Sequence, residues 1–196
     1  MYLFVITKLK TPNMQGFTLI ELLVVVSLIA ILTGFLVPGF NTYSENQSRT
    51  QAQEQVKSDL RSVQNNALSG VGSDGTYTHW GIRFYDNAKN YSYFKATGTN
   101  YSANCLNTTE PVTNGSNLPR NILIRNGPIC VFFSYENGDV TFNDGSGAAD
   151  GFQCNNANPT NCVITVGFSD NTSCEAIELN TAGLIRARSA EVSCEY

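Results

Sequence analysis

Charged residues are scarce in this chain of 196 residues, in which Asp, Glu, Lys and Arg make up only 14% of the sequence. A typical soluble domain contains about a quarter. The formal net charge of −4 gives no general attraction to nucleic acid or anionic lipid. This composition does not suit a nucleotide-handling cytosolic enzyme. The abundant Asn, Thr, Ser, Gly and Tyr favour a β-rich exported domain with polar loops, and the length allows one such domain plus an extra segment.

The first half of the chain lacks cysteine altogether. The six cysteines lie in the second half, at Cys105, Cys130, Cys154, Cys162, Cys174 and Cys194. None are spaced as the C-x₂-C pairs of zinc sites, so we predict no metal site and no cofactor. An even number in a region rich in Gly and Asn favours disulfides formed in an oxidising compartment. Six cysteines allow fifteen pairings; proximity favours Cys154–Cys162, and Cys174–Cys194 would tie the tail to a strand, leaving Cys105–Cys130.

Residues 17–40, FTLIELLVVVSLIAILTGFLVPGF, form an apolar run with a single charged residue. As a helix, the run would extend about 36 Å at ~1.5 Å per residue, enough to cross a hydrocarbon core of roughly 30 Å. It is too long for a cleaved secretory signal, whose small residues follow the apolar core instead of preceding it. Lys8 and Lys10 precede the run, and residues 1–16 contain no acid. We therefore expect a single membrane span with the N-terminus in the cytoplasm.

Glu21 is the charged residue in this run. A carboxylate at the centre of a membrane helix costs roughly 2.5–3.5 kcal/mol, and no Lys or Arg lies between Gly16 and Arg49. One interpretation is a carboxylate that reaches the lipid headgroups. Another is that cleavage after Gly16 creates a partner cation, the α-amino group of Phe17. Between staggered chains, the amine of one would then neutralise the carboxylate of the next and set the axial register.

Residues 16–21, GFTLIE, resemble the processing site of type IV pilins and type II secretion pseudopilins. The resemblance implies that prepilin peptidase cuts after Gly16 and methylates the new N-terminal Phe17, so that residues 1–16 are a leader peptide. It also places Pro38 where many pilins have a helix-bending proline. It implies a precursor in the bacterial inner membrane and a surface filament built with other pilin or pseudopilin subunits on an inner-membrane assembly platform.

Pro38 weakens the helix because it lacks an N–H and clashes with the preceding turn. It either ends the membrane span or bends a continuous helix, and the periodicity that resumes afterwards favours the bent helix. In residues 41–69 apolar residues recur at steps of four and three, forming one stripe: Ala52, Val56, Leu60, Val63 and Ala67. We expect one helix over 17–69, with a transmembrane half at 17–40 and an amphipathic half at 41–69.

Beyond Gly70 the sequence alternates between turn residues and β-rich runs. Strands are expected at 76–84, 91–96, 121–125, 130–135, 140–142, 162–168, 174–179 and 184–189, and polar loops at 97–120 and 143–161. No helical pattern separates these runs, so residues 70–196 are expected to form a mostly antiparallel sheet packed on the helix stripe. The expected fold is α+β and pilin-like. The closing segment CEAIELNTAGLIRARS loosely resembles a GspH/FimT-type domain, which implies a minor pilin or pseudopilin.

Arg186 and Arg188 lie two residues apart on an expected strand and so share one face. The segment imperfectly resembles the G-R-x-R sequence of DNA-binding FimT-like minor pilins, with Ile185 in place of the glycine. One interpretation is a phosphate-binding stripe for captured DNA. The other, favoured by the net charge, is a pair of solvated arginines close to acids such as Glu178, Glu191 or Glu195.

No pattern in the sequence predicts an enzyme. His79 is the single histidine, beside the single tryptophan Trp80, and no nucleophile motif such as G-x-S-x-G accompanies it. Four oxygen-bearing residues beside glycines could hold Ca²⁺, but their spacing fits turns better: Asp139, Asn143, Asp144 and Asp150. The leading hypothesis is a structural filament subunit. The alternatives are a DNA-binding module on a pilus and a membrane-anchored surface protein that never polymerises.

Overall fold

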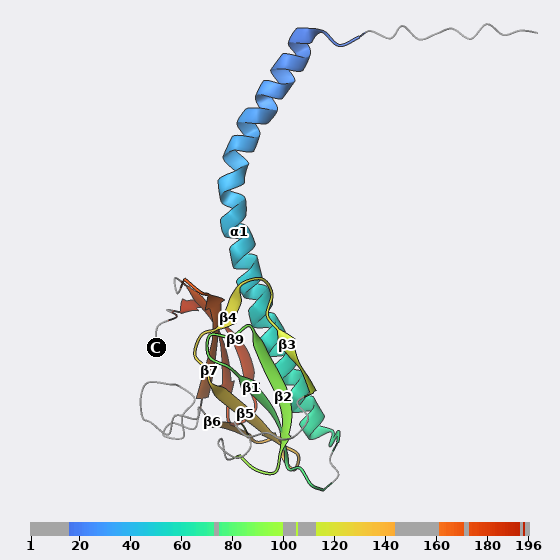
Figure 1. The fold of residues 1–196 in the computed structure, drawn as a ribbon, viewed down its shortest axis with the longest axis vertical. Helices are drawn as coiled ribbons and strands as arrows, with labels where there is room; N and C mark the ends of the chain where they lie inside the picture. The colour runs from blue at the N-terminus through green and yellow to red at the C-terminus, as the bar shows by residue number, and fades with distance from the viewer. Residues whose placement is uncertain are drawn as a thin grey trace, which may run out of the picture. The chain divides into compact units, whose positions relative to one another are not determined.

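The computed structural model describes residues 16–72, 75–99, 105, 113–143, 161–170, 173–192 and 194, with the backbone alone at 36–39, 113–114 and 189–192. These residues form one helix, α1 (Leu19–Leu68), and the β-strands that follow it (Figure 1). The chain divides into two compact units, Met1–Tyr43 and Ser44–Tyr196, so α1 contributes to both. The helix bounds agree within two residues with the expected 17–69.

In the second unit, one face of α1 is buried by the rest of the chain. The exposed fraction is 0% for Ala52, Val56, Leu60 and Ala67 and 3% for Val63. These residues join a single core with apolar side chains from the strands, among them Ile82, Ile164 and Ile177. The stripe expected from the spacing of apolar residues is therefore confirmed as the face on which the helix packs.

The described residues contain nine strands, and every expected strand is among them. They are β1 (His79–Phe84), β2 (Asn90–Ala96), β3 (Thr113–Asn117), β4 (Ile122–Ile124), β5 (Ile129–Ser134), β6 (Val140–Asn143), β7 (Asn161–Phe168), β8 (Cys174–Asn180) and β9 (Ile185–Val192).

The strands form two antiparallel sheets. The first has the order β3-β2-β1-β5-β6 and the second the order β4-β7-β8-β9. A backbone hydrogen bond links the sheets, from the N–H of Val140 in β6 to the carbonyl of Thr181, directly after β8, at 3.3 Å. The α+β architecture, with an N-terminal helix packed on antiparallel sheets, is confirmed and is consistent with a pilin fold. The division into two sheets is a feature that the local sequence did not indicate.

Strand β3 corrects one expectation, because residues 97–120 were expected to be entirely loop. Its sequence, TNGSN, contains no large apolar residue. The strand pairs with β2 through a register shift between Tyr91 and Tyr93. A Cβ at Gly115 would collide with the carbonyl oxygen of Tyr91. Glycine thus permits a close backbone approach that compensates for low β-propensity.

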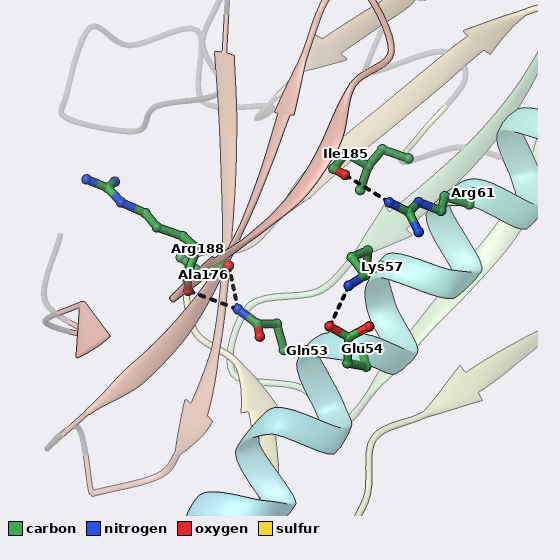
Figure 2. Close-up of polar contacts among 7 residues, drawn as sticks. All are labelled: Gln53, Glu54, Lys57, Arg61, Ala176, Ile185 and Arg188. Carbon is green, nitrogen blue, oxygen red and sulfur yellow. Dashed lines mark hydrogen bonds and ion pairs between the residues drawn. The ribbon is translucent and has the colours of Figure 1, made fainter. Parts of the chain in front are cut away.

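Polar side chains of α1 bind the backbone of both edge strands that flank the helix. Gln55 donates to Ser116 Oγ at 2.8 Å and to the carbonyl of Asn117 at 2.9 Å, both in β3. On the other side, Arg61 donates to the carbonyl of Ile185 in β9 at 3.3 Å (Figure 2). Edge strands carry unpaired backbone groups, so the helix satisfies carbonyls that the sheets leave open.

Gln53 is the most buried of these helix contacts, with an exposed fraction of 5%. Its Nε2 donates to the carbonyls of Ala176, at 2.8 Å, and Arg188, at 3.2 Å (Figure 2). Ala176 and Arg188 face each other across β8 and β9, directly after a register shift in the pairing. A β-bulge disrupts the ladder locally, and Gln53 supplies donors to carbonyls at that point.

Candidate processing and assembly site

The first unit presents an apolar helix surface that the described chain does not cover. Between residues 17 and 35, the large apolar side chains keep exposed fractions from 47% at Val25 to 83% at Phe17. Such a continuous apolar surface marks a membrane or protein interaction site. Two of its three hydroxyls donate inside the helix, Ser27 Oγ to the Leu23 carbonyl and Thr33 Oγ1 to the Ile29 carbonyl, each at 2.7 Å.

Gly16 and Phe17, the residues on either side of the expected cut, lie in a non-helical segment before α1. Both are exposed, and no atom lies within 4 Å of the position that a Cβ on Gly16 would occupy. Within the described residues, the Gly16–Phe17 bond is therefore exposed and lies outside the helix.

Thr18 begins the helix as its N-cap. Its Oγ1 accepts the backbone N–H of Glu21 at 3.3 Å, and its carbonyl accepts that of Leu22 at 3.2 Å. The first bond satisfies an N–H group that a helix start otherwise leaves unpaired, and the second is the first backbone hydrogen bond of the helix. Sequence reasoning overlooked Thr18, although a Thr three residues before Glu and ahead of an apolar run is the spacing of a capping box.

Glu21 lies in the first turn of α1 with its side chain exposed. The partial positive charge of a helix N-terminus stabilises an acid at this position. It remains the single charged residue between Gly16 and Phe40, so the apolar segment supplies no cation of its own. An acid in this place is ready to receive a cation from outside the segment.

Pro38 lies within the bounds of α1, and its side chain falls outside the described residues. Among the residues that are described, no unbroken helix has both the length and the hydropathy of a membrane span. One bent pair, Leu19–Phe35 with Phe40–Leu68, meets these criteria by length and composition.

Arg186 and Arg188 are both exposed on the edge strand β9. Arg186 faces Glu178 across the strand pair and lines a polar hollow of about 220 Å³ with Asn161, Asn180 and Leu184. The Arg188 side chain points away from α1, and its backbone carbonyl accepts a hydrogen bond from Gln53 (Figure 2). The structure thus places an acid beside one of the two arginines.

The expectation of disulfides is confirmed in the second unit. Cys105 is bonded to Cys130, with Cα atoms 6.4 Å apart, and Cys174 to Cys194, with Cα atoms 5.3 Å apart. Cys162 is also disulfide-bonded. Its expected partner, Cys154, lies outside the described residues. The bonds join strands to segments that follow or precede them and so cross-link the second unit, the β unit, which contains all the strands.

His79 is half-buried at the start of β1. Its Nδ1 lies 2.7 Å from Thr78 Oγ1, and its ring meets that of Phe132 edge-on. Burial lowers the pKa of His79, and the nearby Glu136 carboxylate opposes this shift. The neighbouring Trp80 is buried, and its Nε1 donates to the carbonyl of Val71 at 2.8 Å. These contacts are those of residues that pack a strand.

Asp139, one of the four candidate calcium ligands, takes part in a local turn. Asn137 and Asp139 bond to each other, with the Asp139 N–H on Asn137 Oδ1 at 3.1 Å. Asp144 and Asp150 lie outside the described residues. Within the described part of the chain, no three His, Cys, Asp or Glu side chains gather as a metal site.

Comparison with known proteins gives a match for the segment around Gly16, Phe17 and Glu21. Residues 11–37 match the family model of the prokaryotic N-terminal methylation motif, a span that contains Gly16, Phe17 and Glu21. No curated protein and no solved structure gives a significant match to the chain. The motif supports a type IV pilin-like precursor that prepilin peptidase processes, that is anchored in the inner membrane and that assembles with other pilins at the surface. It points to a structural protein and not to an enzyme.

Proposed function

We propose that this chain is a minor pilin or pseudopilin, a structural subunit of a type IV pilus or a type II secretion pseudopilus. Prepilin peptidase removes the leader, residues 1–16, and Phe17 becomes the N-methylated first residue. Residues 17–40 anchor the precursor in the inner membrane and later join subunits, 41–69 form the amphipathic half of the helix, and 70–196 form the extracytoplasmic head. The closing segment 174–189 favours a GspH/FimT-like subtype.

One observation carries this proposal: a lone carboxylate, Glu21, lies exposed on an uncovered apolar helix, four residues after Phe17, the first residue that the proposed cleavage would leave. An isolated acid in lipid is unfavourable by roughly 2.5–3.5 kcal/mol. The amine that cleavage creates on Phe17 is a cation of matching charge. A neighbouring subunit that brings its amine to this acid covers the apolar surface and neutralises both charges at once.

The proposed cleavage is tested by replacing Gly16. The Gly16→Leu variant is expected to stay in the membrane as the full-length precursor, whereas the parent chain matures to a form that begins at Phe17. Gly34→Leu is the matched control, because Gly34 also has open space around its Cβ position but lies inside the helix. Intact mass spectrometry measures the mass of the chain in both variants and so shows whether each has been cleaved. Normal maturation of Gly16→Leu would remove the central claim.

The proposed role of Glu21 is tested by Glu21→Gln, which removes the charge at nearly constant size. We expect membrane insertion to persist and incorporation into filaments to fall. Glu45→Gln is the control, because Glu45 is an exposed acid of the same helix beyond the apolar segment. Quantitative immunoblotting of sheared filaments measures incorporation, and equal incorporation of Glu21→Gln and the parent contradicts the charge-pairing account.

A second candidate function is binding of DNA during natural transformation. The exposure of both Arg186 and Arg188 on an edge strand favours it, and the net charge of −4 and Glu178 opposite Arg186 weigh against it. An electrophoretic shift assay with Arg186→Ala and Arg188→Ala combined tests this function. Weaker retention than in the Arg120→Ala control supports it, and unchanged retention rejects it.

A further inference from the structure

We propose that Thr18 is a positioning residue for assembly: by capping α1 directly after Phe17, it keeps a subunit's own amine apart from its own Glu21. Both charges are then left for neighbouring subunits. This inference rests on the proposed function, because it requires cleavage after Gly16 and pairing of the new amine with Glu21.

The helix start carries the argument. Residues 16–18 are not helical, and α1 begins at Leu19. The Thr18 hydroxyl holds the N–H of Glu21 at 3.3 Å, and its carbonyl holds that of Leu22 at 3.2 Å. An N-cap residue has non-helical backbone angles, so Phe17 stands outside the helix.

A helix extended by two residues would change the pairing. Phe17 and Glu21 would then be helical residues four apart, and such residues lie on one face with Cβ atoms about 5–6 Å apart. The amine and carboxylate of one chain could then neutralise each other. A partner in the same chain acts at a high effective concentration, so this internal pair would compete strongly with a pair between subunits.

The polarity of the helix acts in the same direction. A helix N-terminus has partial positive charge, which favours the acid in its first turn and disfavours a cation there. The cap fixes this end beside Glu21. The amine of the same chain therefore gains nothing from folding back onto its own helix end, and it remains available to the next subunit.

The experiment compares Thr18→Ala, Thr18→Ser and Glu21→Gln. Each is expressed as the full chain, processed by the peptidase and assembled in membranes. Alanine removes the cap and favours helix, whereas serine retains the hydroxyl. Carbodiimide activates the Glu21 carboxylate as an O-acylisourea. Attack by the N-methylated Phe17 amine, which still carries one N–H, forms an amide and releases the urea, so the protein becomes lighter by the mass of one water. Coupling between subunits gives covalent multimers on a denaturing gel. Coupling within a subunit gives a monomer lighter by one water in the mass spectrum.

The parent chain and Thr18→Ser are expected to give multimers. In Thr18→Ala the ratio of multimers to internally coupled monomers is expected to fall about two- to thirty-fold, the range that loss of an N-cap produces. In the Glu21→Gln background neither product is expected from this pair, because glutamine has no carboxylate for the carbodiimide to activate. Mature mass and membrane insertion, measured in parallel, separate this change from a failure to fold or to be processed.

An unchanged ratio in Thr18→Ala, with Glu21-dependent multimers in the parent, overturns the role of Thr18 and leaves the proposed function standing. A parent chain whose mature form does not begin at Phe17, or whose multimers persist in Glu21→Gln, overturns the proposed function itself.

Discussion

The two parts of α1 solve the same problem in opposite ways. Between residues 17 and 35 the large apolar side chains are 47–83% exposed, whereas the stripe from Ala52 to Ala67 is at most 3% exposed. Both parts are apolar enough to require cover. The second receives it from the chain's own sheets, and the first has to receive it from lipid or from other subunits. The exposure of each part thus indicates where its partner comes from.

The carboxylates of the two parts follow the same division. In the second part, the hydroxyl of Tyr91 in β2 donates to Asp59. Glu21 in the first part lies in a segment without Lys or Arg. An acid that the fold satisfies contributes to the stability of the fold, and an acid that the fold leaves open is available for assembly.

Leu60→Ala gives the largest expected difference between the two parts. Leu60 is fully buried in the core shared by helix and sheets, so the substitution is expected to destabilise the β unit by about 2–5 kcal/mol. Leu23→Ala is the matched control, because Leu23 is 60% exposed. Urea denaturation of the full chain in detergent, followed by tryptophan fluorescence, reports on Trp80 in the β unit. Equal losses in both variants would contradict the division of α1 into a covered and an uncovered part.

The disulfides provide the next contrast, because every cysteine lies in the second unit. Replacing Cys174 and Cys194 together by Ser is expected to lower the unfolding free energy of the β unit by about 2–4 kcal/mol. Processing at Gly16 is expected to stay unchanged, since the first unit contains no cysteine. Urea denaturation and the mass of the mature chain measure the two effects. A processing defect in this variant would show that the units depend on each other.

The sequence predicted those features that depend on neighbours along the chain. The apolar run, the stripe and strands such as β5, ICVFFS, follow from local periodicity and composition. Strand β3 did not, because TNGSN pairs with β2 only where Gly115 permits a close approach. The division into two sheets depends on distant pairings such as β1 with β5, which local patterns do not encode. At the candidate site, Gly16, Phe17 and Glu21 came from a motif, and the cap at Thr18 was readable but overlooked.

Gln53 and Gln51 allow a buried polar side chain of α1 to be compared with an exposed one. Gln53 is buried and donates to two carbonyls at the β8–β9 bulge, so Gln53→Ala leaves carbonyls unsatisfied and is expected to cost about 1–3 kcal/mol. Gln51 is exposed two residues earlier on the same helix, and Gln51→Ala is expected to change stability by less than about 0.5 kcal/mol. Thermal unfolding of both variants checks this difference. Similar midpoints would mean that the bulge does not depend on Gln53.

The smallest expected effect is an alkaline loss of stability confined to the second unit. Burial, together with the neighbouring Asp59 carboxylate, raises the pKa values of Tyr91 and Tyr93 above their ordinary value. The folded chain therefore holds these hydroxyl protons more tightly than the unfolded chain does. Their contribution is fully present below the ordinary tyrosine pKa of about 10 and declines as the pH rises beyond it. Unfolding midpoints between pH 8 and pH 11 are expected to fall less steeply in Tyr91→Phe than in the parent, and Tyr43→Phe, at an exposed position of the first unit, is expected to keep the parent's slope. A slope that responds equally to both substitutions would place the alkaline sensitivity outside the contact between Tyr91 and Asp59.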